Sequence, residues 1–393
     1  MSLIAPILSL ILMVFGTGYV MTYVTVELTQ SNYSNISIGF VHAAFYTGFF
    51  FGSLYSEKLI SRVGHIRVIG ALSGLLVATT LLQYMWFDLF TWLICRFSAG
   101  LCIASYYVAI ESWILVTSGQ QSRGKYLALY TISLYLAQSA GHAILGDVGT
   151  SSNQVLIFSC LFVALSIIPI ALSSKNGPEI LIYEPAKIAK YISLAPFGVS
   201  ACLVSGLVMS VVYSFAASFG MAQNLTPAYF VGVIIMGGAL LQWPIGRLSD
   251  RYDRRHVLMV IIGASLLPSL ILFSVTELSW VLYPTAFIFG GFIFSLYPLG
   301  VALVCDCLEA RDILPATGVL LFVWGIGSIL GPLLLPILTD VSSSLLFLFV
   351  ALSITALGIV GLITVRKVEQ GTSTEQLNGS RQALHPNLSQ ESF

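Results

Sequence analysis

An arginine and two histidines lie inside segments that are otherwise apolar: Arg96, His42 and His142. A charged guanidinium in hydrocarbon costs from about 2.5 to more than 10 kcal/mol, so such a side chain normally faces a protein interior or a wet cavity. Imidazole changes its charge between pH 5 and 8, and the guanidinium fork matches carboxylate and phosphate groups. At 1.5 Å per residue, all three side chains lie roughly 6–10 Å below the outer ends of their segments. We therefore expect them to share one cavity that suits an anionic or zwitterionic solute, or proton coupling.

Tyrosines and other polar side chains recur at helical spacing around these three residues. Tyr135, Gln138 and His142 fall on one helical face, and Tyr19 and Tyr23 form a similar stripe near the N-terminus. A lone histidine within a membrane helix is more often a hydrogen-bonded packing residue, and this alternative stands beside the functional one. The predicted solute or proton pathway comprises Arg96, His42, His142, Tyr19, Tyr23, Tyr107, Tyr135, Gln138, Tyr297 and Trp324.

The composition is that of a protein that crosses a membrane many times. Hydrophobic residues make up 57% of the chain and charged residues only 9%, against roughly 25% charged residues in an ordinary soluble domain. The formal net charge is +0, so no overall electrostatic attraction to nucleic acid is expected. Transmembrane helices must therefore position the polar residues named above.

Apolar stretches of about 20 residues predict about twelve transmembrane helices and no strands. The fold class expected is an all-α membrane protein with two pseudo-symmetric bundles of about six helices each. The stretches lie near 4–27, 35–57, 66–87, 90–115, 122–146, 153–173, 195–221, 226–247, 256–275, 279–305, 314–338 and 343–365.

The distribution of Lys and Arg predicts the orientation. If both termini are cytoplasmic, the opposite loops hold Glu27, Asp88, Asp147, Glu277 and Asp340 and no Lys or Arg. Basic residues then gather on the cytoplasmic side, as they do in most membrane proteins. We expect a multi-pass protein of a bacterial inner membrane, with the lipid bilayer as its surroundings.

A polar segment separates two halves that match each other. Arg62 aligns with Arg251, and Gly141 with Gly331, at an offset of about 190 residues, which indicates a duplicated unit. The predicted organisation is a helix bundle over 1–173, a cytoplasmic linker over 174–194, a second bundle over 195–368 and a disordered cytoplasmic tail over 369–393.

The most specific motif is the stretch 246–255, which reads Gly-Arg-Leu-Ser-Asp-Arg-Tyr-Asp-Arg-Arg. It resembles the signature of the major facilitator superfamily between the second and third helices of each half. In that family the aspartate and the basic residues form a cytoplasmic charge network, which holds the two bundles together when the carrier faces outward. The resemblance departs at Asp253, where the family usually has glycine.

The corresponding loop of the first half departs further from the signature. It keeps Arg62 but has Ser61 in place of the acidic residue. Glu111, at the cytoplasmic end of the predicted fourth helix, is the candidate to replace the lost charge, and a role as proton carrier is the alternative. The predicted cytoplasmic gate comprises Glu111, Arg62, Gly246, Asp250, Arg251, Arg254 and Arg255.

Two further resemblances concern Arg96 and the chain as a whole. The stretch 96–104 resembles the fourth-helix motif of the drug:proton antiporter branch, in which the arginine is implicated in proton coupling, but Ala99 replaces a common glutamine. Over 1–366 the sequence is most similar to the YcaD-like bacterial branch of the superfamily. The stretches 96–100, 111–112, 123–124, 242–250, 296–298 and 327–332 carry that similarity.

This resemblance implies a secondary active transporter that moves a small solute by alternating access, and we expect proton coupling and a monomer. A solute-binding membrane sensor without transport and an uncoupled facilitator are the alternatives. No phosphate-binding Gly-x-x-x-x-Gly-Lys-Ser/Thr loop or His-Glu-x-x-His motif occurs, so neither an ATP-driven pump nor an enzyme is expected. The six cysteines show no paired metal-binding spacing, so no cofactor and no metal are predicted.

Overall fold

The structure is a computed structural model, which describes residues 3–117, 123–149, 154–173, 188–275, 278–308, 310–339 and 342–384. Its described elements are helices. The first half contains α1 (Ile4–Thr17), α2 (Val20–Gln30), α3 (Asn35–Val63), α4 (His65–Met85), α5 (Leu89–Thr117), α6 (Arg123–Val148) and α7 (Gln154–Ala171). The second half contains α8 (Ile188–Leu194), α9 (Pro196–Ala222), α10 (Pro227–Arg251), α11 (Arg254–Ser274), α12 (Ser279–Cys305), α13 (Ala310–Leu334), α14 (Pro336–Thr339) and α15 (Leu345–Leu384).

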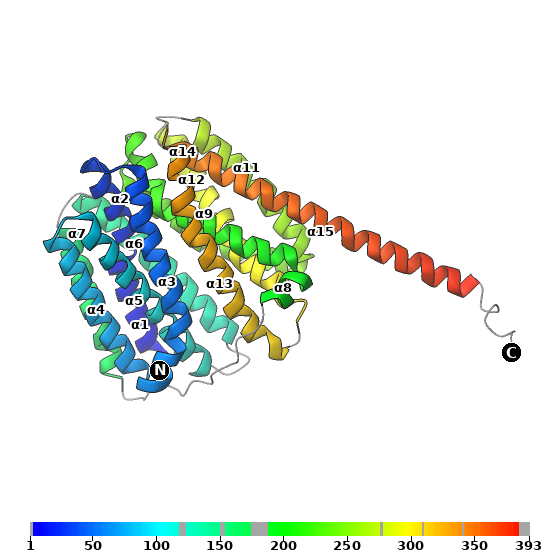
Figure 1. Ribbon diagram of the computed structural model, residues 1–393, viewed down its shortest axis with the longest axis horizontal. Coiled ribbons are helices and arrows are strands. Elements are labelled where there is room, and N and C mark those ends of the chain that lie inside the picture. The colour runs from blue at the N-terminus through cyan, green and yellow to red at the C-terminus, as the bar shows by residue number, and fades with distance from the viewer. Residues whose placement is uncertain are drawn as a thin grey trace.

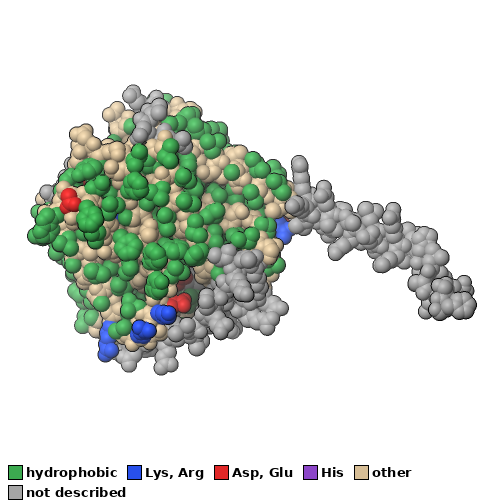
Figure 2. Space-filling model, viewed as in Figure 1, with side chains coloured by type: hydrophobic (Ala, Val, Ile, Leu, Met, Phe, Trp, Pro, Cys, Tyr) green, Lys and Arg blue, Asp and Glu red, His purple; other side chains and the backbone are tan. Residues whose placement is uncertain are grey.

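The helices form a multi-pass membrane protein. In the described part of the chain, 11 helical segments are long and apolar enough to cross a membrane, with α1 and α2 counting as one. The long helix α6 occupies the remaining predicted stretch, 122–146. Hydrophobic side chains are spread over the visible face, and most of the visible Lys and Arg lie near its lower edge (Figure 2). Such an apolar exterior suits a lipid environment.

The two halves lie side by side, with α1 to α7 in one bundle and α9 to α15 in the other (Figure 1). We call the end that carries Lys58, Arg62 and Arg251 the basic end, and the end that carries Asp88 and Asp147 the acidic end. Helix α3 packs against α13, and α6 packs against α10, so both bundles contribute to the interface between the halves.

Matching glycine pairs hold matching helices together in each half. A Cβ atom at Gly48 would lie 1.9 Å from the Phe97 carbonyl oxygen, and one at Gly100 would lie 1.9 Å from the Phe45 carbonyl oxygen, so α3 and α5 touch through their backbones. In the second half, Gly237 and Gly290 bring α10 and α12 equally close. Small residues allow this approach in membrane helices, where association depends on close packing. The predicted duplication is therefore visible in the helix contacts.

Hydrogen bonds join the two halves toward the acidic end. Ser139 donates to the carbonyl oxygen of Gly232 at 3.0 Å, and the Tyr229 hydroxyl donates to the Asp147 carboxylate. Nearby, a Cβ atom at Gly39 would meet the Pro332 carbonyl oxygen at 2.3 Å. The halves are thus sealed against each other at this end.

Two boundaries differ from the sequence-based expectations. The segment 369–393 was expected to be disordered, but α15 continues to Leu384 (Figure 1). Extension of an existing helix needs no new nucleus, and the Glu, Gln and Arg of this segment are good helix formers. The linker prediction over 174–194 lies outside the described residues up to position 187, and its last residues form α8.

The backbone contact between α3 and α5 can be tested with one methyl group. Gly48→Ala should destabilise the protein by about 1–3 kcal/mol, because its Cβ has no space beside the Phe97 carbonyl. Gly74→Ala in α4 is the matched control, since nothing lies within 4 Å of a Cβ there; it should be neutral or slightly stabilising. Thermal unfolding of the purified variants measures both effects, and equal midpoints would contradict the close contact.

Candidate functional site

The two histidines of the predicted pathway both bond to α2. His42 Nε2 lies 2.8 Å from Thr25 Oγ1, and His142 Nε2 lies 3.1 Å from Thr22 Oγ1. Both imidazoles are 0% exposed. Because Thr22 and Thr25 are separated by about one helical turn, they present their hydroxyls to the two histidines from one side of α2.

A chain of hydrogen bonds passes from His42 to the second half. The Thr25 hydroxyl donates to the Ser214 carbonyl oxygen at 2.6 Å, so its oxygen is left to accept from His42 Nε2. His42 Nδ1 is buried and has no hydrogen-bond partner. The imidazole ring also lies edge-on to Phe215, with ring centroids 6.1 Å apart. His42 therefore belongs to the sealed interface between the halves.

His142 is held in one tautomer. Its Nδ1 lies 2.8 Å from the Gln138 carbonyl oxygen, which can only accept, so Nδ1 carries the proton and Nε2 accepts from Thr22. A Cβ atom at Gly232 would lie 3.0 Å from His142 Cβ, so this residue also packs against the second half. Both histidines are thus part of the closed layer toward the acidic end.

Arg96 lies within the first half and is 2% exposed. Its guanidinium carbon is 4.5 Å from the centre of the Phe45 ring, and Nη2 points at the Met21 sulfur. These are soft partners for a full positive charge. Among the described residues no carboxylate pairs with it.

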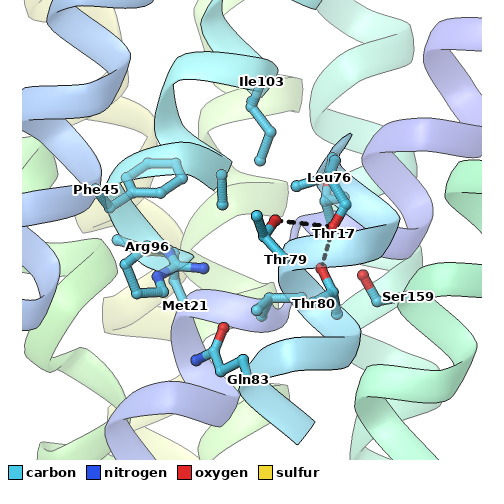
Figure 3. A pocket seen from close by; sticks show the side chains of 12 residues that line it. Thr17, Met21, Phe45, Leu76, Thr79, Thr80, Gln83, Arg96, Ile103 and Ser159 are labelled. Carbon is cyan, nitrogen blue, oxygen red and sulfur yellow. Dashed lines mark hydrogen bonds between the residues drawn. The ribbon is translucent and has the colours of Figure 1, made fainter. Parts of the chain in front are cut away.

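A small cavity of about 30 Å³ lies beside Arg96 and is lined by neither histidine (Figure 3). The structure therefore brings Arg96, His142 and His42 to Met21, Thr22 and Thr25 of α2, within about one helical turn, without placing them in one cavity. Depth along the helices was predicted from the sequence, but the direction in which each side chain points was not.

Five other predicted pathway residues meet between the halves and are only partly buried. Tyr213 donates to Gln138 Oε1 at 3.1 Å, and the ring of Tyr135 lies 5.2 Å from that of Phe294. The rings of Tyr107 and Trp324 both contact that of Phe49, and the rings of Tyr297 and Trp324 lie 6.3 Å apart. We call this group the aromatic cluster: Tyr107, Tyr135, Gln138, Tyr213, Tyr297 and Trp324.

Two predicted pathway residues lie elsewhere, and one residue of the aromatic cluster was not predicted. Tyr19 and Tyr23 are buried in the first half, where Tyr19 donates to the Val155 carbonyl oxygen at 3.4 Å and Tyr23 packs 6.5 Å from Trp92. Tyr213 was not predicted. Its only signal in the sequence is a tyrosine within an apolar stretch, a signal that many packing residues share.

Glu111 borders the aromatic cluster on its basic side. The carboxylate is within electrostatic reach of Tyr130 in its own half and of Tyr297 in the other. Among the described residues it forms no ion pair, and the exposed Arg62 forms none either. The neighbouring Ser112 hydroxyl lies 3.1 Å from His65 Nε2. With no ion pair to the residues that the structure describes, this carboxylate at the edge of the partly exposed aromatic cluster is available to a proton or to a cationic group.

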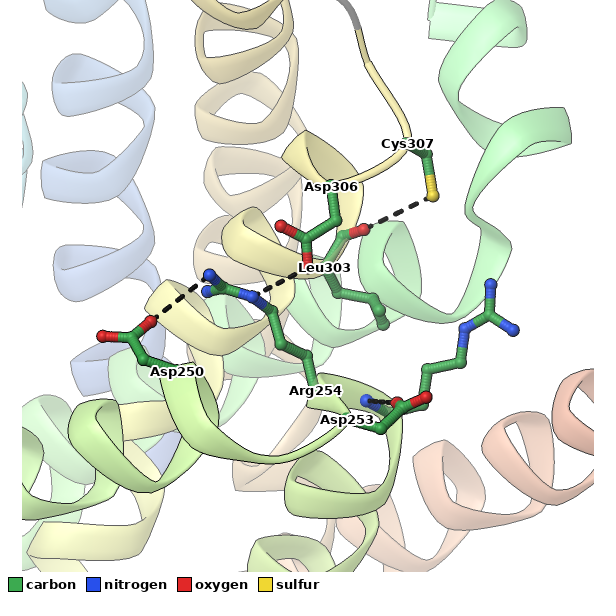
Figure 4. A network of polar contacts seen from close by, with 7 residues as sticks. Asp250, Asp253, Arg254, Leu303, Asp306 and Cys307 are labelled. Atoms are coloured by element: carbon green, nitrogen blue, oxygen red, sulfur yellow. Dashed lines mark hydrogen bonds and ion pairs between the residues drawn. The ribbon is translucent and has the colours of Figure 1, made fainter.

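The charge network of the second half centres on Arg254 (Figure 4). Its Nη2 lies 3.3 Å from Asp250 Oδ1, and its Nε lies 2.7 Å from Asp306 Oδ2. Both carboxylates are more than half exposed, at 68% and 51%. All three residues belong to the same half, so these ion pairs do not join the two bundles.

Arg255 and Gly246 of the predicted gate, and their neighbours Arg247 and Asp253, which were not predicted, form only local contacts. Arg247 lies over the ring of Trp243 at 3.8 Å, and Asp253 accepts from the backbone of Arg255 at 2.7 Å to cap α11. Nothing lies within 4 Å of a Cβ at Gly246, so no neighbouring helix packs closely against this glycine in this conformation. Asp306 was missed, although an acidic residue at the end of the stretch 279–305 was a signal for it.

Comparisons with known proteins agree with this architecture. A model of the Major Facilitator Superfamily matches residues 7–237 and 192–388. The uncharacterized MFS-type transporter YcaD of Escherichia coli O17:K52:H18 (strain UMN026 / ExPEC) is 28% identical over 348 residues, which cover 87% of this chain and 90% of that protein. The crystal structure of the nucleoside transporter NupG has a TM-score of 0.75 at 13% identity, covering 91% of this chain and 97% of that one. A D-xylose-proton symporter has a TM-score of 0.71 at 13% identity, covering 92% and 95%.

The seal between the halves depends on Thr25, and its hydroxyl can be removed alone. Thr25→Val removes the bond to the Ser214 carbonyl and leaves His42 Nε2 without a partner, at about 1–3 kcal/mol for the unpaired nitrogen. We expect the seal to loosen and a thiol at Ser139→Cys to react about tenfold faster or more with a membrane-impermeant maleimide, in a background without native cysteines.

Thr29→Val is the matched control for this experiment. Thr29 lies one turn further along α2 and donates only to the Thr25 carbonyl oxygen within the same helix. Its labelling rate should equal that of the parent protein. If the two valine variants label alike, the bond from Thr25 to Ser214 does not hold the seal.

Proposed function

Because the chain belongs to the Major Facilitator Superfamily, a family of transporters and not of enzymes, we propose that it is a proton-coupled secondary carrier of a small solute. It works by alternating access in the inner membrane of a bacterium, as a monomer with both termini in the cytoplasm. Uncoupled facilitation and solute sensing without transport are the competing proposals.

One observation carries the proposal: the two histidines between the halves are fully buried toward the acidic end, whereas the side chains of the aromatic cluster are partly exposed. His42 and His142 are 0% exposed, whereas Tyr135 and Trp324 keep some exposure. With the basic end in the cytoplasm, this is a carrier closed to the outside and facing the cytoplasm. The charge network around Arg254 lies at the open, basic end, and it becomes buried only when that end closes.

The aromatic cluster suggests the class of solute. Tyrosine hydroxyls and the Gln138 amide offer neutral hydrogen bonds, and the rings offer flat apolar surface. Glu111 is the charged group at the border of the cluster, while Arg96 lies apart inside the first half. We therefore propose a zwitterionic solute with a planar part, whose amino group meets Glu111. An anionic solute would need Arg96, which does not line the cluster in this conformation.

Glu111 is also our proposed proton carrier. In this conformation the sealed layer holds both histidines away from the cytoplasm, and both ring nitrogens of His142 are already bonded. The Glu111 carboxylate lies at the edge of the partly exposed space and has no ion pair among the described residues. A carboxylate that alternately binds a proton and a cationic group couples the two fluxes, because both cannot occupy it at once.

Coupling can be tested with proteoliposomes. The solute is first identified as the metabolite whose level differs between cells that lack and cells that overproduce the protein. Glu111→Gln should then abolish uptake or efflux driven by a pH gradient, because the amide takes up no proton at neutral pH. Exchange of labelled for unlabelled solute without a gradient should persist at a higher solute concentration, because the amide oxygen still accepts a hydrogen bond from the amino group but loses the charge that strengthens it.

Glu57→Gln is the control, since this carboxylate lies exposed at the basic end of α3. If His142→Gln or His42→Gln uncouples the flux while Glu111→Gln does not, the carrier is a histidine of the sealed layer. Solute binding without any flux in the parent protein would favour the sensor.

The charge network should matter chiefly in the conformation that faces outward. Asp250→Asn should leave thermal stability within about 1 kcal/mol of the parent, because exposed ion pairs contribute little. It should raise the labelling of a thiol at Tyr135→Cys from the basic end, because closure of that end loses a charge-assisted bond. Asp253→Asn is the control, as asparagine also caps a helix. Unchanged labelling would remove Asp250 from the gate.

A further inference from the structure

The small cavity beside Arg96 lies inside the first half and not between the halves (Figure 3). Helices α1 to α5 and α7 all contribute to its walls. Its volume is about 30 Å³, and a cavity needs roughly 10–15 Å³ to hold one water molecule. The cavity can therefore hold about two water molecules or one small ion, and it is too small for an organic solute.

The positive charge of Arg96 is not balanced within the protein. The guanidinium is 2% exposed and rests against Met21 and the Phe45 ring. Its Nε is buried without a hydrogen-bond partner. Removing an ion from water costs several kcal/mol unless a counter-charge and hydrogen bonds replace the solvent. Neither replacement is supplied by the described residues.

The remaining polar groups of the cavity leave hydrogen-bond donors free. The Gln83 side chain is 3% exposed, and its Nε2 has no partner. The hydroxyls of Thr79 and Thr80 already donate to the Leu76 carbonyl oxygen, at 3.1 and 2.7 Å, as the dashed lines in Figure 3 show. Thr17 likewise donates to the Met13 carbonyl oxygen. Arg96 and Gln83 thus supply the donors that lack an acceptor.

We propose that this cavity binds a small monovalent inorganic anion of the size of chloride. Water alone accepts from the free donors but does not balance the charge of Arg96, whereas an anion does both. The anion fixes the guanidinium behind Met21 of α2, where the next residue, Thr22, bonds to His142 and Thr25, one turn further on, bonds to His42. It is a structural ligand of the first half, separate from the solute between the halves, so its presence does not depend on the proposed function.

The experiment measures thermal unfolding of the purified full-length protein at constant ionic strength. Sodium chloride replaces sodium gluconate stepwise, because gluconate is too large for the cavity. We expect a saturable rise in the unfolding midpoint, as binding to the folded state alone requires. Bromide should act as chloride does, and sulfate should not.

Three variants locate the effect. Gln83→Leu should weaken the apparent chloride affinity about tenfold or more, which corresponds to about 1.4 kcal/mol, and Arg96→Met should abolish the chloride dependence. Gln242→Leu is the matched control, because this glutamine of the second half also has an unpartnered buried amide atom but does not line the cavity beside Arg96. It should respond to chloride as the parent does.

Two results would overturn the proposal. Equal midpoints of the parent protein in chloride and gluconate would mean that the cavity holds only water. A chloride response unchanged in Gln83→Leu would place the anion elsewhere, and this variant decides the question even if Arg96→Met does not fold.

Discussion

Polar groups between membrane-embedded helices need a partner or access to water, and this constraint organises the whole molecule. Toward the acidic end the requirement is met by direct bonds, such as those of Thr25 and Ser139 to backbone carbonyls of the second half. Around the aromatic cluster it is met by partial exposure. The cavity at Arg96 provides neither a direct partner nor exposure to water for the guanidinium. This is why we propose that an external ion binds there.

The duplication supplies a scaffold, but the buried arginine and the two buried histidines of the predicted pathway belong to the first copy. Gly48 and Gly100 in the first half correspond to Gly237 and Gly290 in the second, and both pairs bring helices into backbone contact. At the same spacing from these glycines, Arg96 corresponds to Ala286 and His42 to Val231. The second half contacts the polar side chains of the first half through carbonyl groups and aromatic rings. An asymmetric site therefore stands on a nearly symmetric frame.

Hydropathy and spacing predicted the membrane spans closely, because lipid imposes the same requirement on every helix. The stretch 279–305 coincides with α12, and 195–221 differs from α9 by one residue at each end. What could not be predicted depends on helix rotation and on distant neighbours. Arg96 was placed at the right depth but faces the interior of its own bundle, and Asp306 meets Arg254 only because α11 and α12 pack together. Tyr19 and Tyr23 form a stripe that turns toward the core for the same reason.

The energies at the two ends decide how alternating access can work in the proposed carrier. Opening the acidic end exposes the Thr25 and Ser139 bonds to water, which can replace them, so the net loss is about 0.5–1.5 kcal/mol for each. The ion pairs of Arg254, with carboxylates more than half exposed, contribute about 0–1 kcal/mol as they stand. They can balance the seal only if closure of the basic end buries them, because ion pairs strengthen as water is excluded. The relative stability of the two conformations therefore depends less on the number of bonds at each end than on which end excludes water.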